Sequence, residues 1–195
     1  IGLVYNFNRE EADLTKSLVH PYVPRFPRHV SYDLVLFGSW RRKGVYVGEK
    51  QIASPGSYPV AGFNFAPMYN LNYKLRFGVS LDGVYDGSAN VYTEDALVEY
   101  DAGSGSSRRK FLVPGIQNQL ALGLSGRAEY VMPFFTIGVG LGTNVLGRGD
   151  LRGLYQVFAL KINVTRSSFL HIGYNLQDFQ TPNYLMLGLG FRFNN

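Results

Sequence analysis

The sequence of 195 residues suits a single domain, and it carries a formal net charge of +5, 15% aromatic residues, 23 glycines and no cysteine. The lack of cysteine excludes disulfides and thiolate chemistry. The mean hydropathy is −0.06, and no apolar run reaches the roughly 20 residues that a membrane helix needs, which leaves a β-barrel as the way to cross a membrane.

The basic residues do not indicate a nucleic-acid site. They are scattered along the chain, and two basic triplets, residues 41–43 and 108–110, fall in expected loops. Neither a basic helix nor a nucleic-acid motif accompanies them. We consider phosphate groups as partners of these triplets, with solvated loop charges as the alternative.

The start of the chain repeats its end. Residues 2–8 read Gly-Leu-Val-Tyr-Asn-Phe-Asn, and residues 188–194 read Gly-Leu-Gly-Phe-Arg-Phe-Asn. We interpret residues 1–8 as an extra strand or as the closing strand of a preceding, related unit, whereas two unrelated amphipathic strands are the alternative. A native mature protein that begins at Ile1 would contradict the tandem interpretation.

Residues 9–30 are predicted to be a periplasmic linker. Pro21, Pro24 and Pro27 each remove a backbone donor and restrict the preceding residue, so regular structure is interrupted. His20 and His29 fall in this linker and are expected to be solvated.

Residues 31–195 are predicted to form an eight-stranded antiparallel up-and-down transmembrane β-barrel. Each of eight amphipathic segments is long enough to cross a bilayer as a tilted strand of about 9–11 residues. The segments are residues 31–41, 59–70, 74–86, 118–130, 134–145, 154–164, 168–176 and 184–193.

The last segment shows the alternation that supports this prediction. Side chains of a strand alternate between its two faces, and here one face is wholly apolar. That face holds Leu185, Leu187, Leu189, Phe191 and Phe193. The ending Gly188-x-x-Phe191-x-Phe193 also resembles the C-terminal signal for insertion of outer-membrane proteins.

The connections alternate in length. Residues 42–58 and 87–117 are long, whereas residues 71–73, 131–133 and 165–167 are short. Outer-membrane barrels have short periplasmic turns and longer extracellular loops, so we expect both termini in the periplasm.

Charged residues gather on the face opposite the apolar one, and we predict that they form an ion-pair network that fills the lumen and leaves no pore. Near the strand ends, Tyr32, Trp40, Tyr69 and Tyr130 suit an interfacial aromatic girdle. The predicted network comprises Asp33, Arg41, Lys74, Arg76, Asp82, Asp86, Arg127, Glu129, Lys161 and Arg192.

A soluble barrel is the alternative fold. Gly38-Ser39-Trp40 matches the Gly-x-Trp of lipocalins, which are also eight-stranded up-and-down barrels. A lipocalin-like lipid carrier would place the apolar face inward around its ligand, so the two folds differ in which face is buried.

No catalytic motif is complete. His171 lies on the inward face beside Asn175, where a hydrogen-bonded lumen histidine is the alternative to a catalytic base. Ser167 and Ser168 do not share its strand face at the required spacing, and no Gly-x-Ser-x-Gly occurs. No spacing of His, Cys and Asp indicates a metal site, and no cofactor is expected.

The layout of eight strands, the closing residues 187–193 and the preceding residues 177–183 resemble the acyloxyacyl hydrolase/PagL-type lipid A deacylase barrels of Bacteroidetes-type bacteria. That family removes an acyl chain from lipid A with a His-x-Ser-Asn motif and a downstream acid. At the matching positions Asp178 replaces the His, Gln180 replaces the Ser, and Met186 stands where the acid is expected.

The resemblance therefore implies a related barrel whose own site is degenerate. We expect a structural or partner-binding unit in the bacterial outer membrane, in contact with lipid, lipopolysaccharide and other outer-membrane proteins. An active lipid A ester hydrolase, using residues not recognised here or a site in a preceding unit, is the alternative.

Overall fold

The computed structural model describes residues 25–42, 44–47, 50–53, 56–101, 106–179 and 181–194. The predicted strand at residues 1–8 and most of the predicted linker lie outside these ranges, as does Gln180. In the described part of the chain, no helix is long and apolar enough to span a membrane.

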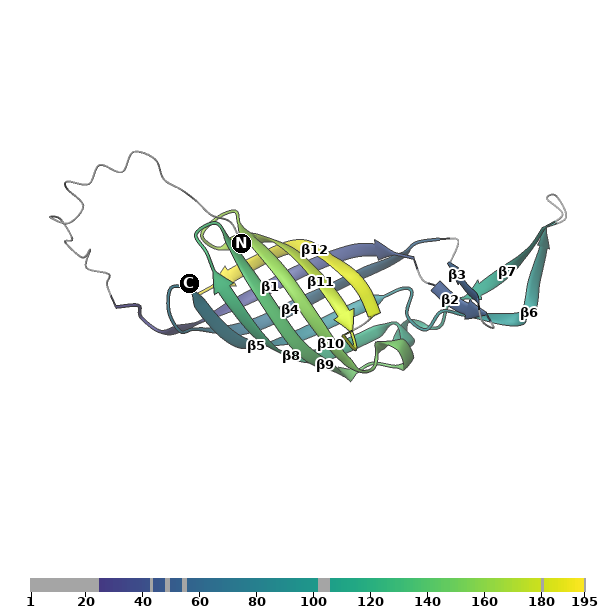
Figure 1. Ribbon diagram of the computed structural model, residues 1–195, viewed down its shortest axis with the longest axis horizontal. Helices are drawn as coiled ribbons and strands as arrows, with labels where there is room; N and C mark the ends of the chain where they lie inside the picture. Colours follow the sequence, from purple (N-terminus) through teal and green to yellow (C-terminus); the bar gives the residue numbers. More distant parts are fainter. Residues whose placement is uncertain are drawn as a thin grey trace, which may run out of the picture.

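Eight antiparallel strands form a closed barrel in the order β1-β12-β11-β10-β9-β8-β5-β4 (Figure 1). The predicted fold class is confirmed, and every predicted strand end lies within three residues of the observed one. The strands are β1 (His29–Arg41), β4 (Tyr58–Asn70), β5 (Leu75–Asp86), β8 (Leu120–Val131), β9 (Phe135–Leu146), β10 (Leu154–Asn163), β11 (Ser168–Gln177) and β12 (Thr181–Phe193).

The first and last strands of the barrel close it. β1 pairs with β12 from Tyr32↔Phe193 to Gly38↔Leu187, and with β4 from His29↔Asn70 to Arg41↔Tyr58. Every barrel strand thus has two antiparallel neighbours, and no barrel strand leaves its backbone donors and acceptors on an open edge.

The connections at the two ends of the barrel differ, as predicted. Short turns join β4 to β5, β8 to β9 and β10 to β11 at the end where β12 finishes. The longer connections lie at the opposite end, where two hairpins extend past the barrel (Figure 1). The hairpins are β2 (Gly44–Val47) with β3 (Lys50–Ala53), and β6 (Tyr92–Asp101) with β7 (Ser106–Leu112).

Two short 3₁₀ turns lie in connections at this end, η1 (Ile116–Asn118) between β7 and β8 and η2 (Gly149–Leu151) between β9 and β10. The hairpins were not predicted, because residues 42–58 and 87–117 were each assigned to a loop. The second basic triplet, residues 108–110, therefore lies in strand β7 instead of in an irregular loop.

The apolar face of the strands points outward. Leu189 is 53% exposed, whereas its neighbour Gly190 is buried, and the same alternation runs around the barrel. The exposed face includes Leu36, Phe63, Phe77, Val79, Leu124, Val139, Leu141, Phe158, Leu170, Ile172, Leu187 and Phe191.

The four predicted girdle residues, Tyr32, Trp40, Tyr69 and Tyr130, are exposed as well. A continuous apolar belt on a closed barrel requires an apolar solvent, which makes this a transmembrane barrel. The lipocalin alternative is wrong, because a lipocalin needs these same residues inside.

Candidate functional site

The lumen contains the charged residues, which lie in three layers along the barrel. Alternate positions of each strand point inward, so one strand contributes to more than one layer. The layer near the short turns is centred on Asp33 of β1, the middle one on Asp82 of β5, and the one near the long loops on Asp86 of β5.

Asp33 is the centre of the most buried layer and is only 1% exposed. Its carboxylate oxygens lie 2.8 Å from Lys161 Nζ, 2.8 Å from Arg192 Nε and 3.1 Å from Arg76 Nη2. Glu129 Oε1 lies 2.6 Å from the same Lys161 Nζ, and the other Glu129 oxygen pairs with Arg76. Five charges from five different strands thus meet in one connected network.

This network holds three cations and two carboxylates. The ring of Phe169 lies 5.0 Å from Lys161 Nζ and 5.2 Å from Arg192 Cζ, so its face stabilises part of the excess positive charge. Each group here is costly to bury alone, and removal of one partner would leave an uncompensated charge in the lumen.

The middle layer saturates the carboxylate of Asp82 with donors. Oδ1 accepts hydrogen bonds from Asn64 Nδ2 at 2.7 Å, Ser80 Oγ at 2.6 Å and Arg127 Nη2 at 2.9 Å. Oδ2 accepts from Ser125 Oγ and Tyr155 Oη, both at 2.6 Å. A carboxylate with five donors has no free lone pair with which to act as a base.

The layer near the long loops pairs Arg41 with Asp86 at 3.2 Å. Arg41 also donates to the backbone oxygen of Asn183 at 3.0 Å and to the Asn183 side chain, which in turn donates to Asn175 Oδ1. Arg41 is therefore held at the long-loop end of the lumen by Asp86 and Asn183, and binding of phosphate groups by residues 41–43 stays a prediction.

Glycines make room for these long side chains. A Cβ added to Gly140 would lie 2.7 Å from Arg127 Cδ, and one added to Gly138 would lie 3.2 Å from Glu129 Cγ. The run of glycines on the inward face of β9 thus lets β8 extend its charged residues across the lumen.

Lys74 does not join the network. Asn72 Oδ1 accepts hydrogen bonds from the backbone N–H groups of Lys74 and Leu75, at 2.8 and 2.9 Å, and this Asx turn ends the connection. Strand β5 therefore begins one residue later than predicted, and Lys74 is exposed at the rim.

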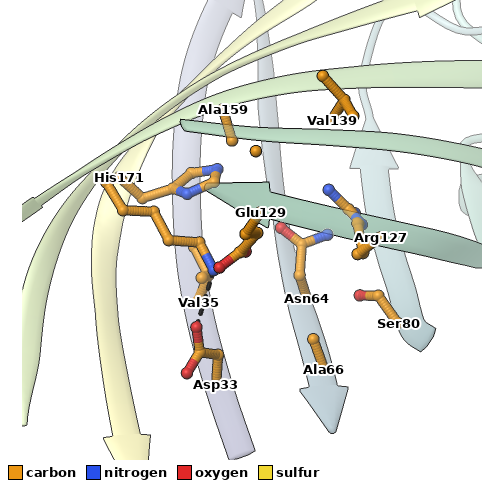
Figure 2. Close-up of a pocket in the computed structure, with 12 residues that line it drawn as sticks. Asp33, Val35, Asn64, Ala66, Ser80, Arg127, Glu129, Val139, Ala159 and His171 are labelled. Carbon is orange, nitrogen blue, oxygen red and sulfur yellow. Dashed lines mark hydrogen bonds and ion pairs between the residues drawn. The ribbon is translucent and has the colours of Figure 1, made fainter. Parts of the chain in front are cut away.

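Two small cavities remain between the layers, and Asn64 lines both. Figure 2 shows the first, with His171, Glu129, Arg127 and Asn64 around it. Each cavity has about 20 Å³ open to the centre of a water molecule, which is enough for about one water and far below the size of a ligand site.

His171 is buried at the first cavity, yet neither ring nitrogen has a hydrogen-bond partner among the described residues. The expected hydrogen-bonded lumen histidine is therefore not what the structure shows, since Asn175 bonds to Asn183 instead. Without a hydroxyl or carboxylate partner in the described part of the chain, His171 also lacks the contacts of a catalytic base.

The positions that correspond to the family's His-x-Ser motif lie elsewhere, at the long-loop end. Asp178 and Phe179 form the turn after β11, both with positive φ, 49° and 62°. Asp178 is exposed, and its backbone N–H donates to the Leu154 oxygen at 3.1 Å. Met186, at the position of the acid, is buried in the lumen. Met186 lies close to His171, since a Cβ added to Gly173 would be 2.7 Å from His171 Nε2 and 3.2 Å from Met186 Cβ, whereas Asp178 lies in the exposed turn. Gln180, at the position of the Ser, lies outside the described residues.

The sequence reasoning missed Tyr155 and Gln156 of β10. Tyr155 belongs to the Asp82 layer. Gln156 lies two residues from each of the outward Leu154 and Phe158, so alternation places it on the apolar face of β10. A single polar residue on an apolar face is a signal that could have identified it.

The fold and the lumen define a class: a transmembrane β-barrel whose interior is filled by paired charges. Residues 30–195 match the acyloxyacyl hydrolase C-terminal domain family, PagL_C. The chain belongs to this family, which confirms the resemblance that the sequence indicated.

A solved structure is similar in part. The crystal structure of Ail, the attachment invasion locus protein of Yersinia pestis, in complex with the heparin analogue sucrose octasulfate, is 15% identical with a TM-score of 0.42. The similarity covers 84% of this chain and 98% of that chain. No protein with a curated description matches.

Proposed function

We propose that this barrel is a non-catalytic member of the acyloxyacyl hydrolase family, a structural or partner-binding unit of the bacterial outer membrane. Its short turns face the periplasm and its two hairpins face outward. The apolar belt and the filled lumen support a role in the membrane that needs neither a pore nor an internal ligand.

The observation that carries this proposal is the environment of the histidines. Acyl hydrolysis by a triad needs a nucleophile, a base within hydrogen-bond reach and an orienting acid. In the described ranges, His29 Nδ1 lies 2.9 Å from the Pro27 oxygen, and His171 has no partner at either nitrogen. Neither histidine there makes a hydrogen bond with a hydroxyl or a carboxylate.

Lipid A profiling tests the proposal. Mass spectrometry would compare lipid A from Gram-negative cells that express the full chain with lipid A from cells carrying the empty vector. We expect identical acylation. Cells that express an active family member serve as the positive control, and there the mass of one acyl chain should be lost.

Loss of one acyl chain in cells that express this protein would contradict the proposal and establish the alternative, an active lipid A hydrolase. In that case Asp178→Ala and His171→Ala would show whether either position takes part in the reaction.

A further inference from the structure

The surface at the short-turn end of the barrel is positively charged. Within the described ranges, the carboxylates nearest this end, those of Asp33 and Glu129, are buried in the lumen and paired there. The exposed charged side chains at this end are all basic: Arg25, Arg28, Lys74 and Arg166.

An aromatic contact brings three of these cations to the same part of the rim. The rings of Phe26 and Tyr73 pack edge to face with their centroids 4.7 Å apart, so the segment before β1 lies against the turn between β4 and β5 (Figure 1). Arg25 and Arg28 lie one and two residues from Phe26, and Lys74 directly follows Tyr73.

The backbone around Lys74 is fixed, whereas its ammonium group is not engaged. Asn72 Oδ1 accepts hydrogen bonds from the backbone N–H groups of Lys74 and Leu75, and the Val131 N–H donates to the Lys74 oxygen at 2.7 Å. The Lys74 ammonium makes no ion pair or hydrogen bond in the part of the chain that the structure describes. The same holds for the guanidinium groups of the two arginines before β1.

A hollow of about 320 Å³ opens beside Lys74 on the outer side of the barrel. Its wall is mostly apolar, since Leu75 pairs with Tyr130 across β5 and β8 and Tyr73 lies at its edge. Exposed tyrosines at the end of a barrel strand lie at the level of the lipid head groups. The hollow therefore lies where the charged group of a lipid meets its acyl chains.

Charge and depth together select the occupant. Basic residues at a membrane surface attract anionic lipids, and each Lys or Arg raises the affinity about five-fold. A soluble anion would pair with the cations but would leave the apolar wall of the hollow uncovered. An anionic phospholipid supplies both a phosphate and an acyl chain at this depth.

We propose that the rim formed by residues 25–28 and the β4–β5 turn binds the head group of one anionic phospholipid. Its phosphate lies among Lys74, Arg25 and Arg28, and the start of one acyl chain fills the hollow beside Tyr130. This inference rests on the part of the proposed function that turns the short turns to the periplasm. It does not depend on whether the protein hydrolyses lipid A.

Native mass spectrometry of the purified full chain tests the role of the cations. Titration with phosphatidylglycerol or phosphatidylcholine of equal acyl chains measures the affinity for each lipid, and the wild type should prefer phosphatidylglycerol. Lys74→Gln and Arg28→Gln should each weaken the binding of phosphatidylglycerol about five-fold. Arg166→Gln removes the same charge from another short turn, so it is the matched control and should bind as the wild type.

Tyr73→Ala tests the place of the site because it keeps every charge. Without the Tyr73 ring, the segment at Phe26 loses its contact with the turn, so the preference for phosphatidylglycerol should fall at least as far as in Arg28→Gln. Tyr69→Ala removes another exposed tyrosine of the same end, one that does not line the hollow, and should leave the preference unchanged. Heat-dependent migration on gels verifies that each variant is a folded barrel.

A wild type without preference for phosphatidylglycerol would overturn the proposal. An equal loss in Arg166→Gln would mean a diffuse attraction to the charged end, and folded Tyr73→Ala protein that binds as the wild type would overturn the site at the turn. None of these results depends on lipid A acylation, so failure here is distinct from failure of the proposed function.

Discussion

The two faces of the same strands have opposite roles in this barrel. On β8, Arg127 and Glu129 point inward into ion pairs, whereas Gly126 and Ala128 lie on the outward face. Among the described residues, the cavities between the paired charges are as small as about 20 Å³, whereas the outward face exposes large apolar side chains such as Leu124 and Leu141. The interior is therefore filled by paired charges, and the exterior is apolar.

This arrangement is the inverse of that in soluble barrels, which place their apolar face inward. A barrel in lipid has its apolar solvent outside, so its apolar face points outward. The following substitutions test the difference between the faces, beginning with the largest expected effect.

Asp33→Ala should have the largest effect. It leaves Lys161, Arg76 and Arg192 with Glu129 as the remaining carboxylate of their network, and breaking a buried ion pair in this way costs about 3–5 kcal/mol. Urea titration of the barrel refolded in lipid vesicles would measure the loss. Lys74→Gln removes one charge at the exposed rim and should leave the stability unchanged; equal losses in both variants would contradict a lumen network.

Leu189→Arg tests the outer face. Leu189 pairs with Leu36 near the middle of β1 and β12, and arginine on the lipid side of a barrel costs about 2–4 kcal/mol at the bilayer midplane. The same titration applies, with Leu189→Met as the matched control. A variant as stable as the control would mean that this face is not in hydrocarbon.

The smallest expected effects on stability come from alanine substitutions at two glycines on the adjacent strands β8 and β9, which compare the two faces directly. Gly140→Ala places a Cβ 2.7 Å from Arg127 Cδ and should cost about 1–3 kcal/mol through overpacking, whereas Gly126→Ala meets nothing closer than 4.0 Å and should be neutral or slightly stabilising. Urea titrations of the two variants would measure the difference in their free energies of unfolding. A larger loss for Gly126→Ala than for Gly140→Ala would mean that Gly126, and not Gly140, faces the filled lumen.

The sequence predicted the barrel strands well because their signal is local. Alternation of large apolar and polar side chains identifies a strand and assigns each residue to a face, as in residues 184–193. The hairpins β2–β3 and β6–β7 were missed because they extend past the barrel, and their residues lack the regular alternation of large apolar and polar side chains that marks the barrel strands.

The contacts within the lumen could not be predicted in the same way. Asp33 and Lys161 are 128 residues apart in sequence, and their contact depends on the register of all the strands around the barrel. Lys74 was misassigned because the Asn72 side-chain oxygen accepts hydrogen bonds from the backbone N–H groups of Lys74 and Leu75, so the turn ends one residue later than the alternation suggests. The burial of Gln156 depends on the turn at Phe179, whose backbone N–H donates to Gln156 Oε1, and alternation does not reveal this contact.

The central claim is that the leucines and phenylalanines of the eight strands face lipid. The chain has no cysteine, so single cysteines at Leu36, Leu124 or Leu170 can carry a nitroxide label without further changes. In lipid vesicles, collision with membrane-dissolved oxygen should exceed collision with a water-soluble nickel complex at all three positions, and the order should reverse for a label at Asn72. The claim would be wrong if the labels at the three leucines collided with neither oxygen nor the nickel complex. It would also be wrong if they collided more often with the nickel complex than with oxygen.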